Sequence, residues 1–345
     1  MVDETQYGER DRRGHWRPFK AIEYPPIVTW PMKPLAALKW FAGFPGYLFP
    51  WNTFYFAVGL AVWYFATPSM ETMKTLSWDW VAFIFVRNMA LVIAYYSIWH
   101  FWLYIKRAQD TQFKFNANWP SNDNSAFLFK SQNIDNVIWS LASGIPICTA
   151  WEVGFYWFMS NGYLPVMTYA DSPIYFWVML LLIPVFRDIH FHWIHRLLHV
   201  GPLYGWFHSI HHNNVNPGPW SGLSMHPVEH LIYFSNVLMY VVVPFHPAHA
   251  VNMFVHTLIA PATGHSGFDE IVVDGDRVID IEQYQHYLHH KYHEVNYSHG
   301  VIPFDRWLGS EHDGTPESHE RMMKRFKERA ARQNAKAEAR ATQET

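Results

Sequence analysis

Histidine is the residue type whose spacing in this chain points most directly to chemistry. Eighteen of the 22 histidines lie between positions 190 and 299. Three compact clusters stand out among them, and these are His195 and His199; His208, His211 and His212; and His286, His289 and His290. On a helix, residues three and four positions apart share a face, so we expect each cluster to offer its imidazoles to one point.

The three clusters predict a site for two metal ions held by nitrogen. Imidazole suits iron, zinc, copper and nickel, whereas the lack of clustered carboxylates argues against magnesium and calcium. The single cysteine, Cys148, allows neither an internal disulfide nor a thiolate metal site. Eight imidazoles are more than one ion can use, so two ions close together are implied. Isolated histidines are expected to be ordinary core residues, and these include His100, His246, His249 and His256.

Composition indicates a membrane protein. Half of the 345 residues are hydrophobic, 18% are aromatic and only 16% are charged. A bilayer-spanning helix needs about 20 apolar residues. Stretches that reach or approach this length cover 51–67, 78–105, 134–158 and 173–187. The last of these is expected to continue as one helix into the first histidine cluster, and a fifth region, 231–262, is broken at Pro244 and Pro247 like a helical hairpin.

These stretches predict an all-α fold. We expect an integral membrane bundle of about four transmembrane helices plus the hairpin, with a cytoplasmic helical cap that carries the two-metal site. The chain then divides into an interfacial N-terminal segment (1–50), transmembrane helices (51–186), a histidine-rich catalytic domain (187–310) and a polar C-terminal helix (311–345). Thr315 as N-cap and Pro316 as first residue are typical of the start of that last helix.

Two polar residues fall inside the second apolar stretch. A charge such as that of Arg87 is costly within a bilayer and is normally paired or lines a cavity. Arg87 and the adjacent Asn88 therefore have either a structural partner, such as a backbone carbonyl, or a role toward a substrate. The sequence leaves both readings open.

Positive charges predict the orientation of the bundle. About seven Lys and Arg residues precede position 51, about four lie in 106–132 and many follow position 264, whereas 159–172 has none. Since positively charged loops remain cytoplasmic, both termini and all three clusters are expected on that side. This predicts an integral protein of a bacterial inner membrane or of the endoplasmic reticulum. The net charge of −3 comes without a dense basic patch, so no nucleic-acid partner is expected.

The histidine region resembles a known family, the membrane-bound fatty acid hydroxylase and sterol desaturase superfamily. Its histidine boxes read H-x3-H, H-x2-H-H and H-x2-H-H, which is the pattern of the three clusters. The flanking segments 188–196, 217–229, 264–267 and 296–309 also resemble the family. The resemblance covers 187–309, about a third of the chain. This sequence departs from the family at His192, where an aromatic residue is usual, and at His293, an additional histidine one turn beyond the third box.

The resemblance implies a di-iron centre held by the eight box histidines, with His265 as a ninth ligand. His226 is a further candidate, with a structural role as an equal alternative. The expected iron ligands are therefore His195, His199, His208, His211, His212, His265, His286, His289, His290 and His226. The roles of His192, His230 and His293 stay open.

Two acidic residues are expected to support these ligands. Asp188 lies at helical spacing before His195 and His199, so its carboxylate is expected to accept the outer N–H of a ligand imidazole. Glu229 is expected to serve likewise. The alternative for each acid is an ion pair with a nearby cation such as Arg187.

The resemblance also implies an activity. A di-iron centre supplied with electrons can use O2 as co-substrate to attack an unactivated C–H bond, which yields an alcohol or an alkene. A site just outside the bilayer suits a lipid substrate, sterol-like or fatty acyl. The chain shows no haem-binding domain, cysteine cluster or Gly-x-Gly-x-x-Gly loop. We therefore expect a separate electron donor, such as a cytochrome b5-like protein, a ferredoxin or a reductase.

Two other functional classes share an abundance of histidine. A metal transporter would place its ligands near the bilayer midplane on broken helices. A zinc-dependent membrane hydrolase usually keeps fewer protein ligands and an open water position. Clusters that follow the apolar stretches and have arginines beside them favour the oxygenase.

Overall fold

Helices make up most of the structure. A computed structural model describes residues 2–273, 275, 277–281, 283–298 and 300–341. Its α-helices are α1 (Pro34–Ala42), α2 (Thr53–Phe65), α3 (Met70–Met73), α4 (Trp78–His100), α5 (Gln132–Trp139), α6 (Ile145–Ser160), α7 (Pro173–Leu198), α8 (Ser209–His212), α9 (Pro227–Tyr233), α10 (Pro247–Gly264), α11 (Tyr284–Tyr292), α12 (Phe304–Trp307) and α13 (Pro316–Ala341). Segments with 3-10 or π-helical hydrogen bonding are η1 (Glu4–Gln6), η2 (Pro26–Val28), η3 (Leu48–Asn52), η4 (Phe101–Ile105), η5 (Leu128–Lys130), η6 (Ser140–Gly144), η7 (Tyr204–His208), η8 (Pro219–Leu223) and η9 (Phe234–Val241).

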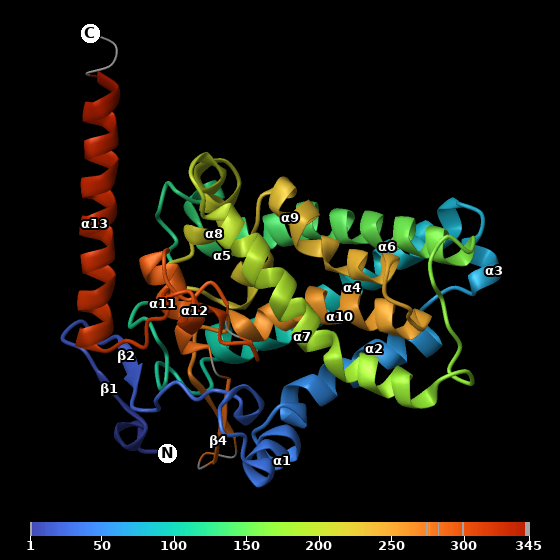
Figure 1. Cartoon of the computed structure of the whole chain (residues 1–345), viewed down its shortest axis with the longest axis horizontal. Coiled ribbons are helices and arrows are strands. Elements are labelled where there is room, and N and C mark those ends of the chain that lie inside the picture. Colours follow the sequence, from blue (N-terminus) through green and yellow to red (C-terminus); the bar gives the residue numbers. More distant parts are fainter. Residues whose placement is uncertain (1, 274, 276, 282, 299, 342–345) are drawn as a thin grey trace.

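Three helical segments are long and apolar enough to cross a membrane. They are Trp78–Ile105, Gln132–Ser160 and Pro173–Leu198. These segments match three of the four apolar stretches. Proline in the first turn of α7 fits its start, because the missing N–H would have no helical partner there. The predicted continuity is confirmed, since α7 runs without a break to the first histidine cluster (Figure 1).

The prediction of four spans is not confirmed, because the first stretch forms only a short helix. α2 has 13 residues, which at 1.5 Å per residue is about 20 Å against an apolar bilayer thickness of about 30 Å. Phe49, before α2, has an extended backbone, and Ala66 leaves the helical conformation after it. α2 instead packs along α10.

The region read as a hairpin supplies the central helix of the bundle. The break lies where it was predicted, since η9 ends at Val241 and α10 begins at Pro247. Nearly every residue of α10 is buried, and this helix contacts α2, α4, α6 and α7. His246 and His249 cap its first turn, with the His246 Nδ1 accepting from the Ala248 N–H at 3.2 Å. Both residues are therefore structural, as expected.

The expectation of a purely α fold is wrong in two places. β1 (Gly8–Arg10) pairs with β2 (Trp16–Pro18), and β3 (Glu270–Val273) pairs with β4 (Arg277–Asp280), both antiparallel. The second hairpin had a sequence signal, because two runs rich in β-branched residues flank Gly275. Both hairpins lie outside the bundle, near the end that carries α11 (Figure 1).

The histidine-bearing elements gather at one end of the bundle. The C-terminal ends of α7 and α10 lie beside α8 and α11 there (Figure 1). The helix expected after position 315 is present as α13, and the Thr315 hydroxyl caps it by accepting from the Ser318 N–H at 3.2 Å. α13 extends away from the body of the protein from this same end (Figure 1).

Candidate metal centre

Nine of the ten histidines predicted as ligands form two groups. The first group is His195, His199, His208, His212 and His289, and the second is His211, His265, His286 and His290. Within each group the ring nitrogens that could bind a metal lie within 4.8 Å of one another. These two groups are called the five-histidine group and the four-histidine group below.

The second and third boxes are each divided between the two groups. In the second box, His208 and His212 belong to the five-histidine group and His211 belongs to the four-histidine group. In the third box, His286 and His290 belong to the four-histidine group and His289 belongs to the five-histidine group. The expectation that each box serves one point is therefore wrong. Residues four apart are turned by only about 40° around a helix, but neighbouring positions are turned by about 100°. One box can thus supply both sites.

The spacing of the ring nitrogens fits metal coordination. In the five-histidine group, the His212 Nε2 lies 3.2, 3.1 and 3.0 Å from the Nε2 atoms of His199, His208 and His289. Two nitrogens that each lie about 2.1 Å from one ion are about 3 Å apart.

The four-histidine group has the same spacing. There the His265 Nε2 lies 3.4, 2.8 and 3.2 Å from those of His211, His286 and His290. Both groups therefore have the dimensions of a site around one ion.

Backbone carbonyls fix the tautomer of several of these rings. The Nδ1 atoms of His195, His289 and His265 lie 2.7, 2.6 and 3.0 Å from the carbonyl oxygens of Tyr297, Val295 and Pro261. A carbonyl can only accept, so each Nδ1 carries the hydrogen and each neutral ring turns a lone pair on Nε2 toward its group.

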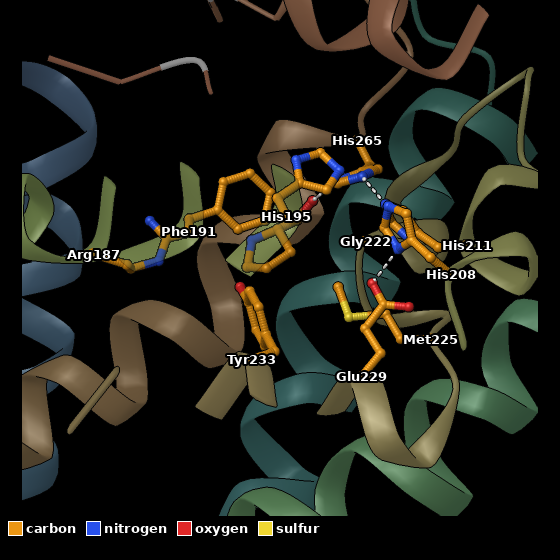
Figure 2. Close-up of a pocket in the computed structure, with 11 residues that line it drawn as sticks. Arg187, Phe191, His195, His208, His211, Gly222, Met225, Glu229, Tyr233 and His265 are labelled. Atoms are coloured by element: carbon orange, nitrogen blue, oxygen red, sulfur yellow. Dashed lines mark hydrogen bonds and ion pairs between the residues drawn. The ribbon is translucent and has the colours of Figure 1, made fainter. Parts of the chain in front are cut away.

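One contact between two rings needs a cation. The His211 Nδ1 lies 3.3 Å from the Ser224 carbonyl, so its Nε2 carries a lone pair like that of His265. The two Nε2 atoms lie 3.4 Å apart, along a dashed line in Figure 2. Two neutral acceptor nitrogens cannot bond to each other. A metal ion between them satisfies both, so the donor set fits a bound metal.

Burial keeps the imidazoles in the neutral form that binds metal. It lowers the pKa of His211 to about 4 and holds the pKa values of His208, His212, His289 and His290 well below the usual range. Nearby histidines lower the last four further, because like charges oppose a second protonation. The groups therefore stay ready to bind a metal at neutral pH.

Glu229 supports a member of the five-histidine group from α9. Its Oε1 accepts a hydrogen bond from the His208 Nδ1 at 2.7 Å, and both residues are buried. Burial raises the pKa of Glu229 and lowers that of His208, because the charged form of each side chain loses its hydration. This contact leaves the His208 Nε2 for the metal position.

A small cavity reaches both groups. Its volume is about 20 Å³, and Figure 2 shows His195 and His208 of the five-histidine group beside His211 and His265 of the four-histidine group. The remaining walls are formed by Arg187, Phe191, Gly222, Met225, Glu229, Tyr233 and Pro261. A space of this size holds about one water-sized molecule. A small reactant here would touch the ligands of both sites.

Two predicted site residues lie elsewhere. His226 belongs to neither group, and its Nδ1 accepts from the Val228 N–H at 3.1 Å at the start of α9. Asp188 shares the inner side of α7 with His195, but its Oδ2 accepts from the Ile302 N–H at 3.0 Å. Among the described residues it forms neither a bond to a ligand imidazole nor an ion pair. Its carboxylate holds the 300–302 backbone because that loop folds directly over it.

The three histidines whose roles stayed open have different surroundings. The His192 ring stacks on Phe304 with centroids 4.5 Å apart. His230 bonds to the Ser143 hydroxyl and the Leu223 carbonyl. His293 stacks on His212 at 4.7 Å and bonds to Tyr204. Sequence reasoning missed Tyr204 and the carbonyl acceptors, because backbone acceptors have no residue signature.

Comparisons with known proteins agree with the histidine boxes. Residues 179–310 match the family model described as fatty acid hydroxylase. A Delta(7)-sterol 5(6)-desaturase of Gibberella zeae is 28% identical over 199 residues, which cover 55% of this chain and 59% of that protein. Another, of Aspergillus fumigatus, is 29% identical over 178 residues, which cover 45% and 56%. The chain thus spans little more than half the length of these relatives.

No solved structure matches the chain. The histidine boxes lie within the region that matches the fatty acid hydroxylase family model. The match over residues 179–310 and the similarity to sterol desaturases agree with the resemblance to the fatty acid hydroxylase and sterol desaturase superfamily.

Proposed function

We propose that this protein is a membrane-bound non-haem di-iron oxygenase that hydroxylates or desaturates a C–H bond of a lipid. The observation that carries the proposal is the pair of histidine groups, five and four residues, that share one cavity at the end of an apolar bundle. Two iron ions fit this donor set, since every ligand is an imidazole. The match of this region to the fatty acid hydroxylase family supports iron over other metals.

Iron bound in the two groups would supply the activation of O2 and the oxidation of the C–H bond. The protein's own part is placement. The carbonyls of Tyr297, Val295 and Pro261 hold three ligand rings, and Glu229 holds a fourth. Rings fixed by such outer contacts keep their lone pairs directed inward through each turnover.

The cavity walls limit access by water. Phe191, Met225 and Tyr233 supply apolar parts of the wall, with Phe191 beside the His195 ring, and the space holds about one water-sized molecule (Figure 2). The Tyr233 hydroxyl donates to the Thr257 carbonyl at 3.0 Å, so it does not compete for a reactant. A hydrocarbon segment placed against these parts of the wall would meet a dry surface.

The substrate is proposed to be a lipid, sterol-like or fatty acyl, that enters from the bilayer. Its support is the three apolar segments beside the site and the relatives named Delta(7)-sterol 5(6)-desaturases. Orientation follows from the charge distribution, which favours a cytoplasmic site in a bacterial inner membrane or the endoplasmic reticulum. The electrons come from a separate donor, a cytochrome b5-like protein, a ferredoxin or a reductase.

The position of the histidine groups and the number of their members fit the two rival functions less well. A transporter needs ligands near the bilayer midplane, whereas these groups lie at the end of α7 and beyond it. A zinc hydrolase usually keeps an open water position with three protein ligands, and both groups here exceed that number.

Metal analysis with Mössbauer spectroscopy tests the proposal. Purified protein is expected to hold two iron ions per chain and to consume O2 when reduced. Iron-free protein that still transports metal or hydrolyses an ester would overturn it. Mass spectrometry of lipids from cells with and without the gene then identifies the reaction, because hydroxylation adds one oxygen atom and desaturation removes two hydrogens.

A further inference from the structure

One side of the five-histidine group lies close to the protein surface. His199 is the only one of the nine grouped histidines that is not fully buried. Two tyrosines cover this side, with the Tyr204 and Tyr297 rings centred 5.3 and 5.0 Å from that of His199. The four-histidine group has four buried members. Among the nine grouped histidines, the one nearest to solvent therefore lies against these two tyrosines.

His293 extends this aromatic layer. Its ring stacks on that of His212, with centroids 4.7 Å apart, and its Nδ1 bonds to the Tyr204 hydroxyl at 2.7 Å. The backbone of His293 has a φ of +65°, a conformation that non-glycine residues adopt at a cost. The bond from its N–H to the His289 carbonyl, 2.7 Å long, helps to hold it there. A strained residue held between a ligand ring and a half-buried tyrosine is consistent with a functional role.

Arginines frame this layer on the outside. The Arg196 guanidinium lies 5.1 Å from the centre of the Tyr297 ring. Arg325 donates to the Glu294 carbonyl at 3.2 Å, and Arg329 pairs with the Glu294 carboxylate. Three arginines face two carboxylates here, Glu294 and the buried Asp305, so this face keeps a small excess of positive charge, although the whole chain has a net charge of −3.

α13 leaves this face open to a partner. Arg325 and Arg329 attach the helix beside His293 and Glu294, and beyond them α13 extends away from the body (Figure 1). The Arg329 side chain remains 56% exposed. A protein that approaches along α13 would therefore meet the arginines first and the Tyr204 and His293 rings beneath them.

We propose that this face, formed by Tyr204, His293 and Tyr297 inside Arg196, Arg325 and Arg329, is where an acidic one-electron carrier protein docks. The inference rests on the proposed function, which needs two external electrons per turnover. In each transfer the carrier loses one electron and the centre gains one, and no bond is made or broken. Charge complementarity selects the carrier, and the aromatic rings shorten the gap that the electron crosses.

A binding experiment on iron-free protein tests the surface alone. The full-length chain in lipid nanodiscs, prepared with a chelator, is titrated with the soluble haem domain of cytochrome b5 or with a plant-type ferredoxin, and fluorescence anisotropy is recorded. At least one probe is expected to bind, more weakly as salt rises. Arg196→Glu with Arg329→Glu is expected to raise its Kd about tenfold.

Matched variants guard against misfolding. Lys74→Glu changes an exposed cation directly after α3, which lies at the other end of the bundle, and is expected to leave Kd unchanged (Figure 1). Arg196→Gln with Arg329→Gln, which removes charge without reversing it, is expected to give a smaller increase. Equal Kd values for the wild type and both arginine pairs, or no binding of either probe, would refute the docking surface.

Reduction kinetics of the iron-loaded protein test the electron path. Tyr204→Leu is expected to slow reduction by the bound carrier while dithionite reduction and iron content stay normal, and Tyr204→Phe is expected to restore the rate because the ring returns. Equal carrier-driven rates in all three proteins would refute the path. Wild-type protein that binds a carrier but oxidises no lipid when O2 is admitted after dithionite reduction and removal of the excess reductant would refute the proposed function and leave the surface standing.

Discussion

The bundle contains two buried polar clusters that are built in opposite ways. Between α4 and α6, Arg87 donates to both oxygens of Glu152 at 2.6 and 2.5 Å, and Asn88 and Tyr156 donate to the same carboxylate. Arg87 also reaches the Ala66 carbonyl at 3.1 Å. In the histidine groups, by contrast, lone pairs such as those of His211 and His265 face each other. The first cluster pairs its donors with acceptors inside the protein, and the second gathers ring nitrogens that a cation could bind.

This difference separates structural from functional polar residues. The sequence left Arg87 and Asn88 open between a structural partner and a substrate role. Their donors are used within the protein, which favours a joint between two apolar helices. Buried polar groups whose donors and acceptors match hold a fold, whereas several ring nitrogens that converge on one point mark a place for a cation.

The largest expected effect comes from removing one ligand from either group. His211→Ala or His289→Ala should abolish lipid oxidation and lower bound iron from two per chain to one or fewer, because each removes one nitrogen from a site. Iron analysis and turnover of the purified variants measure this, with membrane insertion checked by fractionation. His249→Ala, which changes a buried histidine at the start of α10, is the control and should keep its iron. Full iron and activity in either ligand variant would remove that residue from the centre.

Breaking the cluster around Glu152 should lower stability and leave iron binding unchanged. Glu152→Leu leaves the Arg87 charge buried without its partner, which typically costs about 3–5 kcal/mol of stability. Iron per folded chain should stay near normal, since neither residue contacts a histidine group. Unfolding in detergent measures the loss. Arg87→Met combined with Glu152→Leu should recover much of it, and a double variant as unstable as the single one would argue against an ion-pair joint.

The convergence of these histidines could be predicted from the sequence, because helical spacing determines which of them share a face. The i, i+4 pairs His195 and His199, His208 and His212, and His286 and His290 each stay together in one group. The division of the second and third boxes between two groups was missed, because it depends on how α8 and α11 are turned toward α7 and α10. Spacing within one helix says nothing about the rotation of another.

Fold prediction failed where tertiary context decides. The stretch 51–67 is apolar enough for a span, yet its helix has only 13 residues, because the backbone of Phe49 and Ala66 is not helical. One face of α2 packs on α10, while Tyr64 and Phe65 are exposed. Apolar composition alone does not say where a helix begins and ends. The contact predicted for Asp188 is not formed for a related reason, since its partner is a backbone N–H more than a hundred residues away along the chain.

A smaller effect is expected from the acid that does contact a ligand ring. Glu229→Ala removes the acceptor of the His208 N–H, and losses of this kind lower metal affinity by about 10–100-fold. Titration of iron-free protein with Fe2+ under anaerobic conditions measures it. Glu229→Gln should recover most of the affinity, because the amide oxygen can still accept. If the Ala variant binds iron as tightly as the wild type, Glu229 does not orient the ligand.

The smallest effect on iron is expected from Asp188→Asn. The Asp188 carboxylate accepts from the Ile302 N–H at 3.0 Å, and the side-chain oxygen of Asn can accept the same bond. Iron affinity should therefore match the wild type, and stability should fall by about 1 kcal/mol, the usual worth of a weakened hydrogen bond. Gly300→Ala should do more damage, since an added Cβ would lie 2.0 Å from the Asp188 Cγ and force the loop away. A drop in iron affinity for Asp188→Asn as large as that for Glu229→Ala would restore the orienting role expected from the sequence.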